Sequence, residues 1–219
     1  MSAQATWLRG PAQLYDIMNR RRDVRAEFTG TSIDPAVLLR IMQAAHSAPS
    51  VGMSQPWDFV MVRSRKTRAA FRTHVMAERE AFHASLTGER SRTFTGIKIE
   101  GILESTLGIV VTYDPLRAGP AVLGRHSNPD AGVYSVCLAI QNLWLAATAE
   151  GLGVGWVSFF QEPFLRELLD IPSPVTPLAW LCVGPVSELR SVPDLERQGW
   201  RSRAPLTSVL HYEHYGNTH

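Results

Sequence analysis

The residues best suited to chemistry lie near the N-terminus, where several arginines surround one carboxylate. The segment reads Arg20-Arg21-Arg22-Asp23-Val24-Arg25. A guanidinium group presents a planar fork of donors that matches the oxygens of a phosphate, so this segment predicts a phosphorylated ligand. Cations are also favoured at the C-terminal end of a helix. Taken alone, the segment is therefore explained equally well as a solvated basic helix end that pairs with Asp23.

A second basic pattern occurs far along the chain, in Gly199-Trp200-Arg201-Ser202-Arg203. Arg201 and Arg203 could meet the first cluster on a single phosphate group. An arginine pair in a C-terminal tail is more often ordinary solvated surface, so this pattern gains weight only in combination with the first.

Two further segments suit contact with a ligand. The turn 48–57 contains Pro49, Ser50 and Gln55, whose backbone and amide groups could meet the edge of a heteroaromatic ring. Pro, Gly and Ser also mark turns that have no function. The segment Gly151 to Ser158 contains glycines that would allow a ligand close to the backbone. It is not a dinucleotide fingerprint, because its glycines precede a strand instead of following one.

Alternating helices and strands must position these segments. Helices are predicted over 11–22, 35–46, 65–86, 131–150 and 163–169, and strands over 57–62, 107–113, 154–160 and 178–183. The stretch 87–104 predicts a mobile flap, with a short helix over 97–103 as the alternative. Residues 131–150 are apolar nearly all round, which predicts a helix buried inside the domain or against a second subunit.

Composition limits the classes of function. The 219 residues fit a single domain over 1–219, and a net charge of +2 makes nucleic acid an unexpected partner. Polar residues interrupt the most apolar stretch, so no membrane span is expected. Isolated Cys137 and Cys182, and the pair His211 and His214 without acidic neighbours, predict neither disulfide nor metal site. With no export signal in the first ten residues, a reducing cytoplasm is the expected location.

Taken in order, these segments resemble the nitroreductase family of FMN proteins over nearly the whole chain. The matching residues are Arg21, Arg22 and Arg25 in the first motif, Pro49, Ser50, Gln55, Pro56 and Trp57 in the second, Gly151 to Ser158 in the third, and Arg201 and Arg203 in the last. The resemblance implies an α+β fold with a central, mostly antiparallel sheet flanked by helices. It also implies a homodimer whose C-terminal tail wraps the partner subunit. The FMN contacts that it implies are Arg21, Arg22, Asp23, Val24, Arg25, Pro49, Ser50, Gln55, Ser158, Arg201 and Arg203.

The departure from the family pattern is Asp23, which stands where most members carry serine or threonine. Two anions in one site are costly unless cations compensate, so a purely cofactor-holding role explains Asp23 poorly. With Gly155-Trp156-Val157-Ser158-Phe159, this residue makes the chain similar to the branch that consumes reduced FMN and molecular oxygen as co-substrates. That branch makes 5,6-dimethylbenzimidazole, the lower ligand of vitamin B12, and erythrose 4-phosphate.

The resemblance to this branch implies particular roles for a few residues. Asp23 would be a base near the ribityl chain, its pKa held low by the adjacent arginines. Ser158 would hydrogen-bond near flavin N5 or a bound peroxide, and segment 87–105 would be a lid that excludes water.

Two other functions stay open at this point. One is an NAD(P)H-dependent FMN nitroreductase or flavin reductase, and the other is a flavin-binding module without catalysis. Asp23 favours the flavin-fragmenting enzyme, to which a separate NAD(P)H-dependent flavin reductase is expected to supply reduced FMN.

Overall fold

One four-stranded sheet organises the fold. The structure is a computed structural model that describes residues 11–218. The strands are β1 (Trp57–Val62), β2 (Leu107–Tyr113), β3 (Leu152–Val157) and β4 (Thr176–Pro185). Their order is β1-β2-β4-β3, and every neighbouring pair is antiparallel. An isolated parallel bridge between Asp23 and Val154 adds the N-terminal segment at the β3 edge. The α+β fold predicted from the sequence is confirmed.

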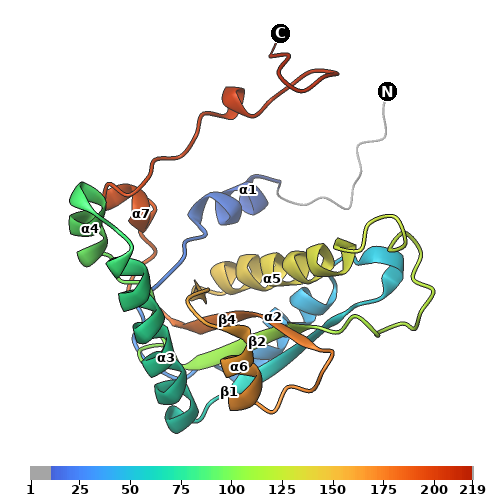
Figure 1. Cartoon of the computed structure of the whole chain (residues 1–219), viewed down its shortest axis with the longest axis horizontal. Helices are drawn as coiled ribbons and strands as arrows, with labels where there is room; N and C mark the ends of the chain where they lie inside the picture. Colours follow the sequence, from blue (N-terminus) through green and yellow to red (C-terminus); the bar gives the residue numbers. More distant parts are fainter. Residues whose placement is uncertain (1–10, 219) are drawn as a thin grey trace.

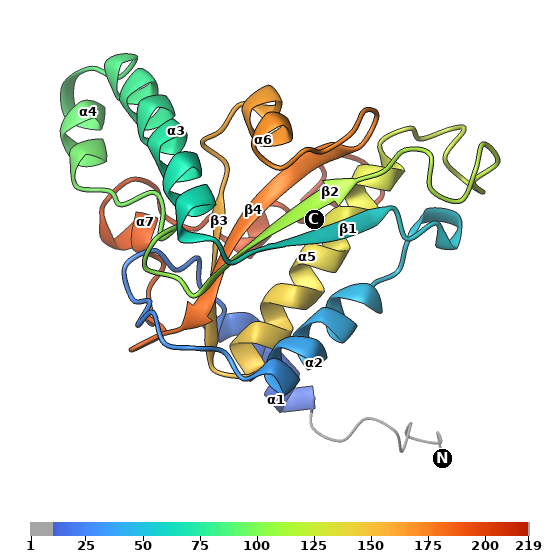
Figure 2. The same ribbon diagram turned by 90° about the horizontal axis from the view of Figure 1, so that it is seen from below.

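Helices cover both faces of this sheet (Figures 1 and 2). They are α1 (Pro11–Arg20), α2 (Pro35–His46), α3 (Arg65–Ala84), α4 (Gly88–Thr95), α5 (Ala131–Ala149), α6 (Glu162–Leu168) and α7 (Asp194–Arg197), with 3-10 turns at Val51–Met53 and Leu206–Ser208. Figure 2 shows α2 and α5 on one face and α3 and α6 on the other. Each face has its own buried apolar cluster, one around Ile41 and Leu143 and one around Phe71 and Trp180.

The predicted start of α2 is confirmed in detail. Asp34 Oδ1 accepts a hydrogen bond of 2.7 Å from the backbone N–H of Ala36, and Pro35 occupies the first turn. Such a cap satisfies a donor that the first helical turn leaves unpaired. The cap fixes where α2 begins, and the helix then runs to the turn that carries Pro49 and Ser50.

Helix α5 forms much of the core. Of the described helices it alone is long and apolar enough to cross a membrane by length and composition, and 44% of its apolar window is buried inside the chain. Its buried side, which includes Ile140 and Leu143, packs in the same cluster as α2 and the sheet. Tyr134 and Leu138 on the other side are 55% and 46% exposed. It is therefore a core helix with an uncovered apolar strip. The prediction that it is buried on most sides is only partly fulfilled within one chain.

The stretch after α3 differs from the prediction. The helix in this region is α4, and the predicted helix over 97–103 is wrong. Ile97, Ile99 and Ile102 are instead buried in the cluster beneath α3, where they fill the core from irregular backbone. Burial of these apolar side chains outweighs the weak helical spacing that they share.

The C-terminal part of the predicted strand 154–160 also differs. β3 begins earlier, at Leu152, and ends at Val157. The backbone N–H of Phe160 then donates to the carbonyl of Ser158 at 3.0 Å, which turns the chain away from the sheet. Ser158 therefore lies in the turn after β3.

Candidate functional site

Asp23 is held against the edge of β3 by backbone and side-chain contacts. The N–H of Val24 donates to the carbonyl of Val154 at 2.9 Å. Asp23 Oδ1 accepts from the N–H of Trp156 at 3.0 Å, and Asp23 Oδ2 accepts from Arg25 Nη2. The carboxylate position is thus fixed by the strand on one side and by a cation on the other.

The glycines of β3 make this contact possible. A Cβ atom at Gly155 would lie 2.1 Å from the carbonyl oxygen of Val24, and one at Gly153 would lie 2.4 Å from Val186 and 3.0 Å from Val24. No side chain fits at such distances. From the sequence we expected these glycines to let a ligand approach the backbone closely. In the structure they admit the segment that carries Asp23.

The ionisation of Asp23 differs from the expectation that its arginines hold the pKa low. Burial is the largest influence and raises the pKa of Asp23 above its ordinary value, although Arg25, the Trp156 N–H and Arg21 oppose it. The carboxylate of Asp194 adds a further upward push. Removing water from a carboxylate disfavours its charged form, and here that penalty exceeds the attraction of the cations. The side chain is still 33% exposed, so it can reach a ligand.

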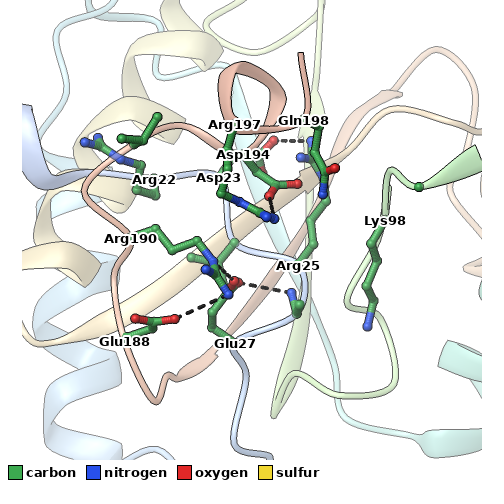
Figure 3. A pocket seen from close by; sticks show the side chains of 14 residues that line it. Arg22, Asp23, Arg25, Glu27, Lys98, Glu188, Arg190, Asp194, Arg197 and Gln198 are labelled. Atoms are coloured by element: carbon green, nitrogen blue, oxygen red, sulfur yellow. Dashed lines mark hydrogen bonds and ion pairs between the residues drawn. The ribbon is translucent and has the colours of Figure 1, made fainter. Parts of the chain in front are cut away.

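A pocket of about 220 Å³ opens beside Asp23 (Figure 3). Its walls come from three parts of the chain: segment 22–27, the residues after α4, and the tail 188–198. Its charged and amide residues are Arg22, Asp23, Arg25, Glu27, Lys98, Glu188, Arg190, Asp194, Arg197 and Gln198. A neighbouring hollow of about 150 Å³ shares Asp23 and adds Arg21 and Arg203.

The structure therefore brings together Arg21, Arg22, Arg25 and Arg203 around Asp23. Arg201 does not line either hollow and is exposed. Burial and the charges of Arg203 and Arg21 lower the pKa of Arg22. Cations that repel one another in this way are stabilised by an anion between them, which supports the predicted phosphate site.

Arg22 also has a structural task. Its Nη1 atom donates to the carbonyls of Asn19 and Arg21, both at 2.7 Å, and its Nη2 donates to the carbonyl of Ser191. These bonds fasten the tail to the end of α1. The Nε atom of Arg22 is buried without a partner among the described residues.

Ser158 is exposed just after β3, and its hydroxyl has no hydrogen-bond partner within residues 11–218. It lies two residues after Trp156, whose N–H donates to Asp23, and one residue past the end of β3. This hydroxyl is free to bind a ligand.

The turn that carries Pro49, Ser50 and Gln55 lies elsewhere. Ser50 Oγ accepts from the Gln55 N–H at 3.0 Å, and the N–H of Val51 donates to Ser135 Oγ at 3.0 Å near the start of α5. The backbone carbonyl of Arg22 accepts a hydrogen bond of 3.0 Å from Trp144 Nε1, near the other end of α5. From Ser135 to Trp144 the helix rises about 13 Å. One chain therefore does not bring the two halves of the predicted site together (Figure 1).

Several pocket residues carry no recognisable motif in the sequence. Arg190 pairs with Glu27 at 2.5 Å and with Glu188 at 3.3 Å, and Asp194 pairs with Arg197 (Figure 3). Asp194 follows Pro193 at the start of α7, which is a local helix-start signal. Only the folded path of the tail places it beside Asp23.

Other nucleophile and metal chemistry finds little support in the described residues. Burial raises the pKa of Cys182 to about 12, so its thiol stays protonated at neutral pH. Within 11–218 no three His, Cys, Asp or Glu side chains group as a metal site would require.

Comparison with known proteins agrees with this fold. Residues 18–185 match the model of the nitroreductase family. The chain belongs to the nitroreductase family.

Similar proteins narrow the comparison further. The 5,6-dimethylbenzimidazole synthase of Rhodospirillum rubrum is 40% identical over 185 residues, which cover 84% of this chain and 87% of that protein. The enzyme of the same name from Rhodobacter capsulatus is 36% identical over 193 residues, covering 88% and 92% of the two chains. A crystal structure of oxidised iodotyrosine deiodinase bound to FMN and 3-iodo-L-tyrosine superposes with a TM-score of 0.72 at 20% identity, covering 92% of this chain and all of that one (100%). That last likeness shows the shared fold.

Proposed function

We propose that this chain fragments reduced FMN with molecular oxygen to give 5,6-dimethylbenzimidazole and erythrose 4-phosphate. The observation that carries the proposal is the carboxylate of Asp23, held between the Trp156 N–H and Arg25 at the floor of an arginine-rich pocket. The names of the Rhodospirillum and Rhodobacter relatives support the same reaction. In this reaction FMN is the substrate: the flavin ring supplies the dimethylbenzene carbons and both nitrogens of the product, and the first ribityl carbon supplies the carbon between those nitrogens, which leaves four carbons for erythrose 4-phosphate.

The arginine cluster would hold the FMN phosphate. Arg21 and Arg203 face the smaller hollow together with Arg25, and the mutual repulsion that lowers the pKa of Arg22 would be relieved by a dianion. Arg201 is next to this group in sequence but lines neither hollow, so we assign it a smaller share of the phosphate contact.

Asp23 would accept the proton that must leave the ribityl chain when the bond between its first and second carbons breaks. A carboxyl whose pKa lies above its ordinary value is a stronger base than a solvated aspartate, which suits it to this task. Arg25 and the Trp156 N–H orient the two oxygens. The free hydroxyl of Ser158 would donate to the substrate ring or to oxygen bound there.

Water exclusion would come from a lid within 87–105. Phe94 and the isoleucines after α4 are fixed in the core, so the part proposed to move is the N-terminal half of α4 with the turn before it. Gly96, directly after α4, already lines the pocket beside Asp23. Closing this segment would shield the reacting flavin from bulk water.

A homodimer would complete the site. The turn with Ser50 and Gln55 lies at the opposite end of α5 from Asp23, and α5 has an uncovered strip at Tyr134 and Leu138. Pairing two chains along α5 would cover this strip and bring the turn of one subunit to the arginine cluster of the other. The tail after Trp200 is exposed and extends from the body (Figure 1), which suits wrapping around the partner.

Product analysis tests this function. The purified protein is incubated in air with chemically reduced FMN, and the products are identified by mass spectrometry. Formation of 5,6-dimethylbenzimidazole with erythrose 4-phosphate supports the proposal. Sustained NAD(P)H oxidation with FMN recycled would instead identify a nitroreductase or flavin reductase. Binding of FMN with neither reaction would leave a non-catalytic flavin-binding module and overturn the proposal.

The source of reduced FMN can be tested in the same assay. We propose that a separate NAD(P)H-dependent flavin reductase in the cytoplasm supplies it. With oxidised FMN and NAD(P)H, product should then form only after an unrelated flavin reductase is added. Product formed without that addition would show that the chain reduces its own flavin.

A further inference from the structure

Four aromatic side chains from distant parts of the sequence meet beside the pocket. Phe82 lies on α3, Phe94 on α4, Phe159 after β3, and Trp200 in the tail, and we refer to them as the aromatic cluster. Ring centroids are 5.0 Å apart for Phe82 and Phe94, and 5.6 Å apart for Phe82 and Phe159. They are 6.4 Å apart for Phe94 and Phe159 and 6.0 Å apart for Phe94 and Trp200. These are distances at which aromatic rings attract one another.

Three of the segments that would act on the substrate are each attached to one ring of this cluster. Phe159 directly follows Ser158, Phe94 lies in α4 two residues before the pocket residue Gly96, and Trp200 directly precedes Arg201. The proposed lid, the free hydroxyl and the phosphate-binding tail therefore share one packed contact.

Trp200 anchors the tail to its own subunit, where its N–H donates to the carbonyl of Leu195 in α7 at 2.8 Å and the N–H of Arg201 donates to the same carbonyl at 3.4 Å. The backbone carbonyl of Trp200 accepts from Arg90 Nη1 at 2.7 Å, and the same guanidinium lies 4.7 Å from the Trp200 ring centroid. Residues 201–210 beyond it are all exposed. Arg203 nevertheless lines the hollow beside Asp23. The packing of Trp200 on α4 therefore helps to set the position of Arg203.

Helix α4 is held from its other side by α3. The Arg79 guanidinium lies 4.9 Å from the Phe94 ring centroid and donates to the carbonyls of Phe94 and Thr95 at 3.3 Å. These bonds fasten the C-terminal end of α4. In its N-terminal half, Ser91 Oγ lies 3.0 Å from His83 Nε2 of α3 and Arg90 faces Trp200, so that half is held by α3 and by the tail together.

We propose that Trp200 is a positioning residue that couples binding of the FMN phosphate to closure of α4 over Ser158. The inference rests on the proposed function and adds a use for the phosphate beyond affinity. An anion on Arg203 holds the tail, the tail holds Trp200 on α4, and α4 stays packed against Phe159. When this chain of contacts is broken, bulk water reaches the flavin. Reduced FMN and oxygen are then converted to oxidised FMN and hydrogen peroxide, with two electrons and two protons passing to oxygen.

The test compares Trp200→Ala, Trp200→Phe and Arg90→Gln with the parent protein. The matched control is Phe164→Ala, because Phe164 is also partly buried and ring-stacked, on His74 at 3.9 Å, but lies outside the cluster. The readout is the ratio of 5,6-dimethylbenzimidazole formed to hydrogen peroxide released. Trp200→Ala and Arg90→Gln should lower this ratio about tenfold or more, as misplacement of reacting groups does. Because Trp200 positions Arg203, KM for reduced FMN should rise in Trp200→Ala by at most the roughly tenfold expected for loss of Arg203. The ratio is therefore measured at saturating reduced FMN, where it reports closure alone.

Trp200→Phe should recover most of the ratio, and Phe164→Ala should leave it unchanged. An unchanged ratio in both Trp200→Ala and Arg90→Gln, with melting temperatures like that of the parent, would overturn the coupling. Equal loss in Phe164→Ala would also overturn it, because the effect would then be general destabilisation.

A second measurement separates failure of this inference from failure of the proposed function. Hydrogen exchange of residues 88–96 is followed with no ligand, with riboflavin and with oxidised FMN. FMN should slow exchange there far more than riboflavin in the parent, but not in Trp200→Ala. If the parent shows this protection yet makes no 5,6-dimethylbenzimidazole, the function is wrong and the coupling stands. If the product forms and FMN protects no more than riboflavin, the coupling is wrong and the function stands.

Discussion

The Oδ1 atom of Asp23 lies 3.0 Å from the backbone nitrogen of Trp156 and accepts its hydrogen bond. This bond fixes a carboxylate of the N-terminal segment to the strand that ends just before Ser158. The two side chains to which we assign proton transfer and oxygen contact are thus positioned by one strand edge. Gly155, directly before Trp156 in β3, permits the close approach of the Asp23 segment, because a Cβ at this position would collide with the Val24 carbonyl.

Replacement of Asp23 should separate binding from chemistry. Asp23→Ser and Asp23→Asn remove one negative charge from beside Arg21, Arg25 and Arg203, so FMN affinity should survive or rise. Asp23→Asn also keeps an oxygen acceptor for the Trp156 N–H. The fragmentation rate should fall by about 100-fold or more, the usual size of a general base contribution. Single-turnover product formation and fluorescence titration measure the two effects.

Asp194→Asn is the matched control for this experiment. Asp194 lines the same two hollows, but its carboxylate pairs with Arg197 in the structure. Removal of its charge should change the fragmentation rate by less than about tenfold. An equal loss in both variants would assign the effect to charge alone and would remove the proton-accepting role of Asp23.

The raised pKa of Asp23 makes stability depend on pH in a defined direction. A carboxyl that binds its proton more tightly in the folded state stabilises that state fully below its ordinary pKa of 3.8, and this contribution is lost as pH rises through the raised pKa. Asn does not titrate. The ligand-free melting temperature of Asp23→Asn should therefore gain on that of the parent as pH increases from below 3.8. A constant difference across the series would contradict the raised pKa.

Ser158→Ala should slow product formation while FMN affinity stays within about threefold of the parent, because one exposed hydroxyl adds little to binding. The backbone turn is retained, since the Phe160 N–H bonds to the carbonyl of residue 158. Stopped-flow rates and titration of oxidised FMN supply the comparison. Parallel loss of affinity and rate would make Ser158 a binding residue.

Much of the fold could be predicted because its signals are local. The Asp34-Pro35 cap, the continuous apolar run of β2 and the long apolar helix α5 each determine structure from neighbouring residues. The helix predicted over 97–103 is absent because the isoleucines of this stretch fill a core formed by distant elements. Local spacing carries no information on such tertiary burial.

The site was predictable in composition and less so in energetics. The arginine motifs indicated that Arg21, Arg22, Arg25, Arg201 and Arg203 would gather, and all of these except Arg201 line the hollow beside Asp23. Their contact with FMN stays a prediction. The sequence could not show how deeply Asp23 is buried, so the expected direction of its pKa was wrong. The role of Asp194 depends on the path of an irregular tail, which no periodic pattern encodes.

Arg203 and Arg201 should differ in their contribution to phosphate binding. Both side chains are exposed, but Arg203 lines the hollow with Arg21 and Arg25, whereas Arg201 lines neither hollow. A charge-assisted contact contributes about 1.5 to 3 kcal/mol, so Arg203→Ala should weaken FMN binding about tenfold or more and leave riboflavin binding nearly unchanged. Arg201→Ala should have less than about a threefold effect. Fluorescence titration of both flavins checks this, and equal effects of the two substitutions would refute the assignment.

The shared site between subunits can be tested by complementation, since Asp23 and Gln55 lie at opposite ends of α5. Asp23→Asn removes the proposed base, and Gln55→Ala removes an amide of the turn and should lower activity about tenfold. If each site takes Asp23 from one subunit and Gln55 from the other, a mixed dimer contains one intact site and one doubly altered site. Random co-assembly of equal amounts makes half of the dimers mixed, so about a quarter of the parental rate should return. Mixing the variants after assembly, without subunit exchange, is the control and should give only the mean of the two separate rates. If co-assembled protein also gave only that mean while light scattering showed a dimer, both residues would serve the same site within one chain, and the crossed arrangement would be wrong.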